Sequence, residues 1–480
     1  MFIGRKKELE FLETRYKQPL GQLIVLYGRR RIGKTETLRE FCKDKEHIFF
    51  SCTQSPDKQQ LKSFSQKIFK EKIPASQYIN EFQDWNQAFL SIAELPYKKK
   101  RIVVIDEFPY MCKNNPAIPS ILQNIWDNHL KDKNVMLILC GSAMSFIEKE
   151  LLSEKNPLYG RATGIYKMKE MSFYESIQFF PNYNEIDKII AYSILGGIPH
   201  YLRQFNPQLS IADNIKQNIL SKGSVLFNEV EFLLHQEFRE TAIYNSIIQA
   251  IAFGHTRMNE ITRHALINNT STTNIYLKNL MEVGLVKREL SIDAGNKEKT
   301  NQNRGIYKLS DHYFRFWYQY VFSNYSELEE GDVDGVYQYI IQPTLEQFSS
   351  FIFEDICIQF MRELQKKNKL PFRYEKIGKW FGKTSLKDSQ DIVESEIDIL
   401  AFSRFEKSYI VGECKFKKQS FRYSEYLDTK AKLASLQDKN TFYYFLFSKS
   451  GFDEKLINES KLNSNIYLID LHQLYSLDVE

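Results

Sequence analysis

Residues 23–35 read LIVLYGRRRIGKT, an apolar strand that runs into the pattern G-x-x-x-x-G-K-T. A helix-compatible segment follows over residues 36–42. Gly28 and Gly33 let the backbone curl so that successive N–H groups face inward. This nest, together with the positive N-terminus of the next helix, can hold a triphosphate. The alternative is a glycine-rich turn with a stray lysine. The strand-loop-helix context favours a nucleotide site, for ATP or GTP.

The type of each side chain in this loop predicts its role. Lys34 would reach the β- and γ-phosphates, and the Thr35 hydroxyl would ligate Mg²⁺. The predicted nucleotide contacts are Gly28, Arg29, Arg30, Arg31, Ile32, Gly33, Lys34, Thr35 and Glu36.

A second buried strand, residues 101–107 (RIVVIDE), ends in two carboxylates. Asp106 would hold Mg²⁺ through water, and Glu107 would polarise the attacking water. A third apolar strand, residues 135–140, ends in Gly141-Ser142. Ser142 is a candidate sensor of the γ-phosphate, and a helix N-cap is the alternative. Arg161 is a candidate arginine finger or phosphate sensor, with a surface salt bridge as the equal alternative.

These motifs in combination resemble the archaeal-type ATPase family, in the STAND branch of AAA+-like P-loop NTPases. The resemblance is carried by FIGR (residues 2–5), GRRRIGKT (28–35), IDEF (105–108), Gly141-Ser142 and LYGR (158–161), and it covers about the first 235 residues. It implies that the nucleotide is ATP. GGIPHYL (196–202) resembles the family's G-x-P motif, which implies that Pro199 contacts the nucleotide from a helical lid. On sequence alone, the glycine pair is a helix stop.

The middle of the chain has the order of a winged helix-turn-helix. Helices are expected over residues 243–253, 258–266 and 271–283, with strands over 285–290 and 306–309. The third helix would offer Thr272, Thr273, Asn274 and Lys278 to the major groove, and the wing would offer Lys297, Lys299 and Arg304 to phosphates. The alternative is a spacer or a protein-contact surface, which the few cations on the third helix favour.

Two further segments precede the C-terminal domain. The aromatic run 313–320 (YFRFWYQY) is expected to be a helix packed between domains rather than a base-stacking platform. Residues 323–335 contain several acidic side chains and are expected to be a linker.

The C-terminal part places acidic residues on one helix and two strands. A helix over 343–367 contains Glu354, a strand over 395–402 carries Asp398, and a strand over 409–416 carries Glu413 and Lys415 on one face. This order resembles the PD-(D/E)XK nuclease superfamily. An edge strand with alternating charges is the alternative, and such domains can bind nucleic acid without cleaving it.

The resemblance implies a divalent metal, Mg²⁺ or Mn²⁺, held by Asp398, Glu413 and the Cys414 carbonyl, with Glu354 as an additional ligand. Lys415 would orient the attacking water. Phosphate contacts are expected just past this strand, at Lys417, Lys418 and Arg422.

Bulk composition limits the classes of protein. The 480 residues are 43% hydrophobic and 14% aromatic, which is typical of globular domains rather than disorder. A net charge of +5 permits local contacts with nucleic acid without arguing for them. Six cysteines without C-x-x-C spacing indicate reduced thiols and a cytoplasmic location. No apolar run approaches the roughly twenty residues of a membrane span, so no membrane partner is expected.

The predicted fold is therefore a multidomain α/β protein. Its expected parts are a P-loop ATPase core with a parallel sheet (1–175), a helical lid (176–238), a winged helix-turn-helix (239–322), a linker (323–342) and a restriction-endonuclease-like α/β domain (343–480). The predicted function is ATP binding and hydrolysis coupled to DNA binding and metal-dependent DNA cleavage. The alternative is a STAND-type signalling switch, in which ATP controls assembly, including homo-oligomers, and the downstream domains only contact partners.

Overall fold

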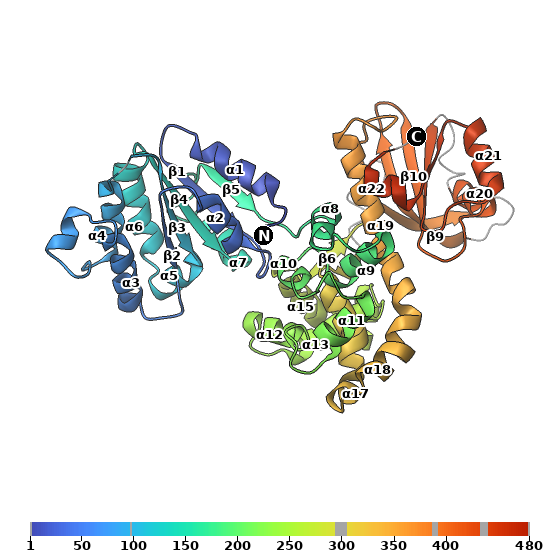
Figure 1. The fold of residues 1–480 in the computed structure, drawn as a ribbon, viewed down its shortest axis with the longest axis horizontal. Helices are drawn as coiled ribbons and strands as arrows, with labels where there is room; N and C mark the ends of the chain where they lie inside the picture. Colours follow the sequence, from blue (N-terminus) through green and yellow to red (C-terminus); the bar gives the residue numbers. More distant parts are fainter. Residues whose placement is uncertain (1, 97, 293–304, 386–391, 433–439, 479–480) are drawn as a thin grey trace. The chain divides into compact units, whose positions relative to one another are not determined.

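The computed structural model describes residues 2–96, 98–292, 305–385, 392–432 and 440–478 (Figure 1). The chain divides into two compact units. The first comprises Met1–Met171, Gly197–His200 and Glu282–Gly284, and the second comprises Ser172–Gly196, Tyr201–Met281 and Leu285–Glu480. Among the described residues, no helix combines the length and the apolar character that crossing a bilayer requires.

The first unit is built on a five-stranded sheet with the order β2-β3-β4-β1-β5, and every neighbouring pair is parallel. Its strands are β1 (Gln22–Tyr27), β2 (His47–Ser51), β3 (Arg101–Asp106), β4 (Val135–Gly141) and β5 (Gly164–Lys167). Every residue of β1, β3 and β4 is buried, because helices cover both faces of the sheet. The predicted parallel-sheet P-loop architecture of the N-terminal domain is confirmed.

Helices α1 and α2 lie on one side of this sheet and α3 to α6 on the other (Figure 1). The helices are α1 (Lys6–Tyr16), α2 (Lys34–Cys42), α3 (Asp57–Phe69), α4 (Trp85–Leu90), α5 (Phe108–Asn114), α6 (Ile118–Ile125) and the short α7 (Met144–Phe146). The sheet has a hydrophobic core on each face, and alternate residues of β1 belong to each core. Ile24 and Leu26 pack toward α1 and α2, and Leu23 and Val25 pack toward α3 to α6.

The second unit begins with α8 (Phe173–Ser176) and α9 (Glu185–Leu195), and continues through α11 (Ile211–Ile215) and α12 (Glu229–Glu237). Between them, α10 (Pro199–Leu202) starts in the first unit and ends in the second. Of the segment expected to be a lid, only Gly197–His200 belongs to the first unit. Ile189 and Tyr192 of that segment instead join the hydrophobic core of the C-terminal sheet, as does Phe173 just before it.

Three helices and a hairpin occur where the sequence predicted them. The helices are α13 (Ala242–Ala252), α14 (Met258–His264) and α15 (Thr270–Glu282), and β6 (Val286–Glu289) pairs antiparallel with β7 (Ile306–Leu309). The predicted phosphate contacts of the wing, Lys297, Lys299 and Arg304, lie outside the described residues.

The aromatic run forms a packed helix, as predicted. Helix α16 (His312–Phe316) continues as a π-helical turn over Trp317–Val321. Trp317 is 0% exposed and its indole N–H donates to the Phe227 carbonyl, while the Tyr313 hydroxyl donates to the Leu226 carbonyl. These rings are inside the unit and no base can stack on them.

The segment that the sequence predicted to be a linker is helical. Residues of this stretch form α17 (Tyr325–Glu329), α18 (Val333–Gly335) and a π-helical turn that leads directly into the long helix α19 (Gln342–Lys366). Leu328, Val336 and Ile341 are buried, so the acidic side chains occupy the solvent face of helices. The acidic side chains of this segment therefore mark the solvent-exposed face of its helices.

The C-terminal sheet is mixed and has the order β12-β11-β10-β9-β8. Its strands are β8 (Lys376–Ser385), β9 (Ile392–Ser403), β10 (Ser408–Lys415), β11 (Thr441–Ser448) and β12 (Ile466–Ile469). Strands β8, β9 and β10 pair antiparallel, and β10, β11 and β12 pair parallel. Helices α19 and α22 (Leu471–Ser476) pack in one core of this sheet, and α20 (Tyr423–Ala431) and α21 (Glu454–Leu462) in the other.

Candidate functional site

The glycine loop lies between β1 and α2, at the carboxyl end of the parallel strand. Gly33 adopts φ +87°, a left-handed conformation that favours glycine, and it caps the N-terminus of α2. A Cβ on Gly28 would lie 2.5 Å from the Met168 carbonyl oxygen, so only glycine fits there. The backbone therefore has the curled course that a phosphate nest requires.

The Lys34 ammonium group lies over this loop. Its Nζ donates to the carbonyl oxygens of Gly28 and Arg29, each at 2.9 Å. Burial lowers the pKa of Lys34, because the charged form is removed from water. Two carbonyls satisfy two of the three ammonium donors, and an anion beside the loop would be a better partner for this charge.

One chain of hydrogen bonds joins four predicted site residues, and the Glu107 N–H links its two halves by donating to Asp106 Oδ1 at 3.0 Å. The Thr35 hydroxyl donates to Asp106 Oδ2 at 2.8 Å, which brings the two expected Mg²⁺ ligands together. The neighbouring Glu107 accepts at Oε2 from the Ser142 hydroxyl (2.9 Å) and the Ser142 N–H (3.2 Å). The alternative reading of Ser142 as an N-cap fails, because Ala143 is the capping residue of α7 and makes no side-chain cap bond.

The remaining loop side chains contact neighbouring segments. Arg29 forms an ion pair with Glu170 at 3.0 Å, and Arg30 donates to the Tyr110 hydroxyl. The Ile32 side chain is buried in the core, and Glu36 pairs with Arg39 at the surface.

The segment from Gly197 to His200 lies beside the loop although it is distant in sequence. The Pro199 ring comes within 3.6 Å of the position a Cβ on Gly33 would occupy, and the His200 ring contacts the Arg31 guanidinium. The Met171 N–H donates to the Gly197 carbonyl. Pro199 is thus placed at the loop, where the family resemblance implied it.

Arg5 is a site residue whose role the sequence did not reveal. Its side chain is buried, and its guanidinium donates to the carbonyls of Ile32 (2.6 Å) and Lys169 (2.7 Å) and to Glu8. Arg5 therefore ties the N-terminus to the loop. The FIGR motif was the available signal, and nothing in it shows which carbonyls the guanidinium reaches.

Arg161 is not brought to the loop. Its Nε donates to both carboxylate oxygens of Asp127, at 2.9 and 3.0 Å, and its Nη1 donates to the Pro157 carbonyl. This geometry is the salt bridge that the sequence left as the alternative. A role across a subunit interface stays a prediction.

Of the four side chains that the third predicted helix was expected to offer to DNA, Thr273 is buried and Thr272 is half-buried. Thr273 is 0% exposed and bonds to the Thr262 hydroxyl, so it cannot read a base edge. Asn274 and Lys278 are exposed, and Ile275 between them is 61% exposed. The segment is helical, as its periodicity predicts, but Thr273 lies on the helix face that points into the protein.

Asp398 lies in a β-bulge in the C-terminal sheet. Gly378 pairs with Leu400 whereas Trp380 pairs with Ile397, so Asp398 and Ile399 together face a single residue of β8. The ladder between β9 and β10 runs only as far as Ile399 and Gly412. Bulges bend a strand and re-aim its side chains, and they are common beside active sites.

The expected metal-binding carboxylates converge here only in part. Asp398 Oδ2 accepts the Cys414 N–H at 2.8 Å, while Glu413 pairs with Lys415 at 2.7 Å and lies 3.5 Å from Lys432. Glu354 pairs with the buried Lys379, a residue that sequence reasoning missed as part of the site. Within the described ranges, no group of three or more His, Cys, Asp or Glu side chains is arranged to hold a metal ion. The Glu354 carboxylate thus meets a lysine, and its role as an additional metal ligand stays a prediction.

The carboxyl group of Asp398 has an unusual environment. Burial, followed by the nearby Glu413 and Glu354 carboxylates, raises the pKa of Asp398 to about 8. Its described hydrogen-bond partner is a single backbone N–H.

This pKa predicts how Asp398→Asn changes stability in metal-free buffer. The unfolded chain releases the Asp398 proton near pH 4, while the folded chain retains it to about pH 8. Wild-type stability therefore falls relative to Asp398→Asn as pH rises through this window, and the difference levels off above pH 8. Thermal unfolding in EDTA from pH 5 to 9 checks this. Asp428→Asn, at an exposed position, is the control; a pH-independent gap for Asp398→Asn would contradict the raised pKa.

Comparisons with known proteins agree with the N-terminal geometry. Residues 2–205 match a family described as an ATPase domain predominantly from Archaea, and residues 317–427 match a family described from archaeal and bacterial proteins of unknown function. An uncharacterized ATP-binding protein of Methanocaldococcus jannaschii is 50% identical over 46 residues, which are 10% of this chain and 78% of that protein.

Two solved structures have partial similarity to this chain. The Walker-type ATPase of Pyrococcus abyssi matches with a TM-score of 0.47 and 20% identity, over 66% of this chain and 96% of that chain. The ORC2 protein of Aeropyrum pernix matches with a TM-score of 0.42 and 13% identity, over 64% and 89% of the respective chains.

A second protein of Methanocaldococcus jannaschii, itself uncharacterized, is 34% identical over 478 residues. The alignment covers 98% of this chain and 99% of that protein, so it includes both units. The chain therefore belongs to the same protein family as this full-length relative and carries an archaeal-type P-loop ATPase domain over residues 2–205.

Proposed function

We propose that the first unit binds ATP with Mg²⁺ and hydrolyses it. The observation that carries this proposal is the hydrogen-bonded chain from Thr35 through Asp106, next to the pair of Glu107 and Ser142. A loop that cradles phosphates, a hydroxyl and carboxylate suited to Mg²⁺, and a second carboxylate suited to a water are the parts that P-loop hydrolysis uses.

Each group has a distinct task in this proposal. The backbone from Gly28 to Thr35 and the Lys34 ammonium hold the phosphates, with Pro199 against the loop. A bound Mg²⁺ would neutralise phosphate charge. Glu107 accepts a proton from the attacking water, and Ser142 holds the Glu107 carboxylate in one orientation through two hydrogen bonds.

Lys34→Ala is expected to weaken ATP binding at least about tenfold, because the variant has no ammonium group to pair with the phosphates while the backbone donors remain. Calorimetric titration with ATP·Mg²⁺ measures this, and GTP in a parallel titration tests the implied preference for ATP. Lys62→Ala, at an exposed lysine of α3, removes an equal charge from the same unit and should leave affinity unchanged. If Lys34→Ala binds ATP with unchanged affinity and has an intact melting profile, ATP does not bind at the glycine loop as proposed.

A second candidate function belongs to the C-terminal domain. We propose that the domain order predicted above applies, and that residues 343–480 bind DNA and cleave it with a divalent metal. The support is Asp398, a half-buried carboxyl in a bulge near Glu413 and Lys415, with a raised pKa and a backbone N–H as its described hydrogen-bond partner. Asp398, Glu413 and the Cys414 carbonyl fit a hard divalent ion, which would polarise a phosphodiester.

Covalent connectivity supports coupling between the two activities. Gly197–His200, beside the glycine loop, is flanked on both sides by helices of the second unit. Glu282, the last residue of α15, forms an ion pair with Lys149 within the first unit. A change of nucleotide state at the loop would act directly on the ends of these helices.

The rival function is a signalling or assembly switch without cleavage. Its support is the surface of α15, where Ile275 is exposed and Lys278 is the single described cation, which suits a protein partner, including a second copy of this chain, better than duplex DNA. Light scattering with and without ATP distinguishes a switch that assembles from an enzyme that remains in one state.

A further inference from the structure

A cavity of about 810 Å³ lies within the second unit, between two of its modules. One wall comes from the start of α14, from α15 and from the β6–β7 hairpin, and the other comes from β8 and β9. We call this cavity the inter-module cleft. The residues that give it chemical character are Arg257, Asn259, Asn274, Arg288, Phe381 and Glu396.

Hydrogen bonds hold the two walls together. After β6, the Ile292 N–H donates to the Lys379 carbonyl at 2.9 Å, and the Phe381 N–H donates to the Ser291 hydroxyl at 2.9 Å. The segment that follows β6 thus bonds to β8, and the ion pair of Lys308 with Glu289 supports the hairpin itself. Both walls of the cleft thus belong to the second unit and are joined by hydrogen bonds.

The side chains of the cleft suit an anionic polymer with bases. Arg257 and Arg288 are exposed, and the Arg288 guanidinium carbon lies over the Tyr307 ring, 5.7 Å from its centre. Planar guanidinium groups match phosphate oxygens well. Asn259 and Asn274 offer amide groups of the kind that bond to base edges, and Phe381 is a partly exposed ring.

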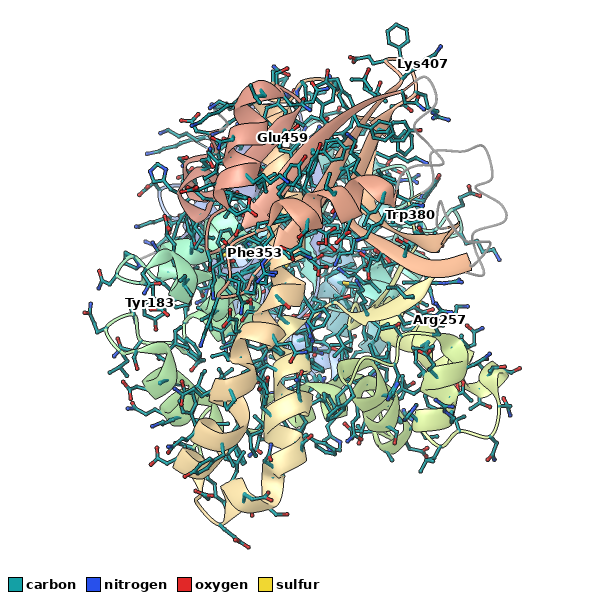
Figure 2. The ribbon with its side chains drawn as sticks, turned by 90° about the vertical axis from the view of Figure 1, so that its right-hand side faces the viewer. Tyr183, Arg257, Phe353, Trp380, Lys407 and Glu459 are labelled. Atoms are coloured by element: carbon teal, nitrogen blue, oxygen red, sulfur yellow. The ribbon has the colours of Figure 1, made fainter. Side chains whose placement is uncertain are left out.

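The cleft lies next to the bulged strand. Glu396, which lines it, precedes Asp398 by two residues on β9, about 7 Å along a strand. The cleft volume falls in the range of about 300–1,000 Å³ that is typical of small-ligand pockets. Figure 2 labels Arg257 and Trp380, which stand near its two walls.

We propose that the inter-module cleft binds single-stranded DNA, with Arg257 and Arg288 on the phosphates, and leads the strand to Asp398. This inference rests on the DNA-directed function proposed above and specifies it: the substrate is a single strand, and the α14–hairpin module contributes half of its site. The Glu396 carboxylate repels the phosphates of the strand. It lies at the end of the cleft nearest the candidate metal ligands.

The test is fluorescence anisotropy of the full chain with a labelled oligodeoxythymidine in EDTA, so that no metal or cleavage enters the readout. Arg257→Ala/Arg288→Ala should lose at least about tenfold in affinity. Its log–log salt slope should fall by about 1.4, which is 0.7 for each of the two phosphates that the arginines would neutralise on a single strand. Glu396→Gln should bind more tightly than wild type, an effect of opposite sign that general unfolding cannot produce.

Arg203→Ala/Arg404→Ala is the matched control, since it removes two exposed arginines of the same unit outside the cleft. If Arg257→Ala/Arg288→Ala binds the oligodeoxythymidine as tightly as wild type does, the cleft is not the binding site. The proposal that the protein binds DNA would still stand, with the site elsewhere. Tighter binding of a blunt duplex than of the single strand, abolished in the same variant, would also overturn it. ATP turnover measured on the same preparations shows separately whether the function of the first unit holds.

Discussion

Glu107→Gln is expected to lower ATP turnover by at least about a hundredfold while ATP binding persists. The amide keeps the shape of the side chain but cannot accept a proton from water, and general-base catalysis contributes about 10²–10⁴-fold. In the wild-type protein the carboxylate is already oriented by two hydrogen bonds from Ser142. Single-turnover phosphate release separates this chemical step from binding, which calorimetry measures on the same variant.

Two controls make that result specific. Glu94→Gln, at an exposed position of the first unit, should turn over ATP like wild type. Ser142→Ala should give an intermediate loss, because the carboxylate remains but no longer accepts the hydroxyl hydrogen bond at 2.9 Å. Equal turnover in wild type and Glu107→Gln would assign the base to another residue. Wild-type turnover that rises with protein concentration and disappears in Arg161→Ala would place Arg161 across an interface.

Lys415→Ala is expected to bind a divalent metal as wild type does but to lose DNA cleavage, whereas Asp398→Asn should lose both. The lysine, which donates to Glu413 at 2.7 Å, acts on the water and the developing charge rather than on the ion. Asp398 supplies the carboxylate that the ion would neutralise. Calorimetry with Mn²⁺, and nicking of plasmid, linear and single-stranded DNA with Mg²⁺ or Mn²⁺, measure the two properties on one preparation.

Lys407→Ala is the matched control for this pair. Lys407 is an exposed lysine in the turn between β9 and β10 (Figure 2), away from Glu413, and its removal should leave metal binding and cleavage intact. If the wild-type chain binds no divalent ion at millimolar concentration and nicks no form of DNA, the C-terminal domain is not an active nuclease. The switch function then becomes the conclusion.

The site in the first unit could largely be predicted, because most of its functional groups lie close together in the sequence. The loop from Gly28 to Thr35 contains both its conformational requirement and its phosphate-binding groups, and the long apolar runs of β1, β3 and β4 show burial on both faces. Parallel strands with their carboxyl ends at one edge bring Thr35 and Asp106 together. The partner of Ser142 was not predictable, since it depends on β3 and β4 being neighbours.

The order of helices and strands, the glycine loop and the acidic strand ends could be predicted from local sequence, because hydrogen-bonding geometry and side-chain periodicity act over a few residues. Which charged side chains meet depends instead on tertiary packing. The bulge shifts the register at Asp398, Lys379 pairs with Glu354, and Asp127 pairs with Arg161. These ion pairs join residues that are far apart in sequence, at separations of 25 and 34 positions, and the bulge changes the register by one residue. Their geometry depends on how whole elements pack, and residue spacing does not encode it.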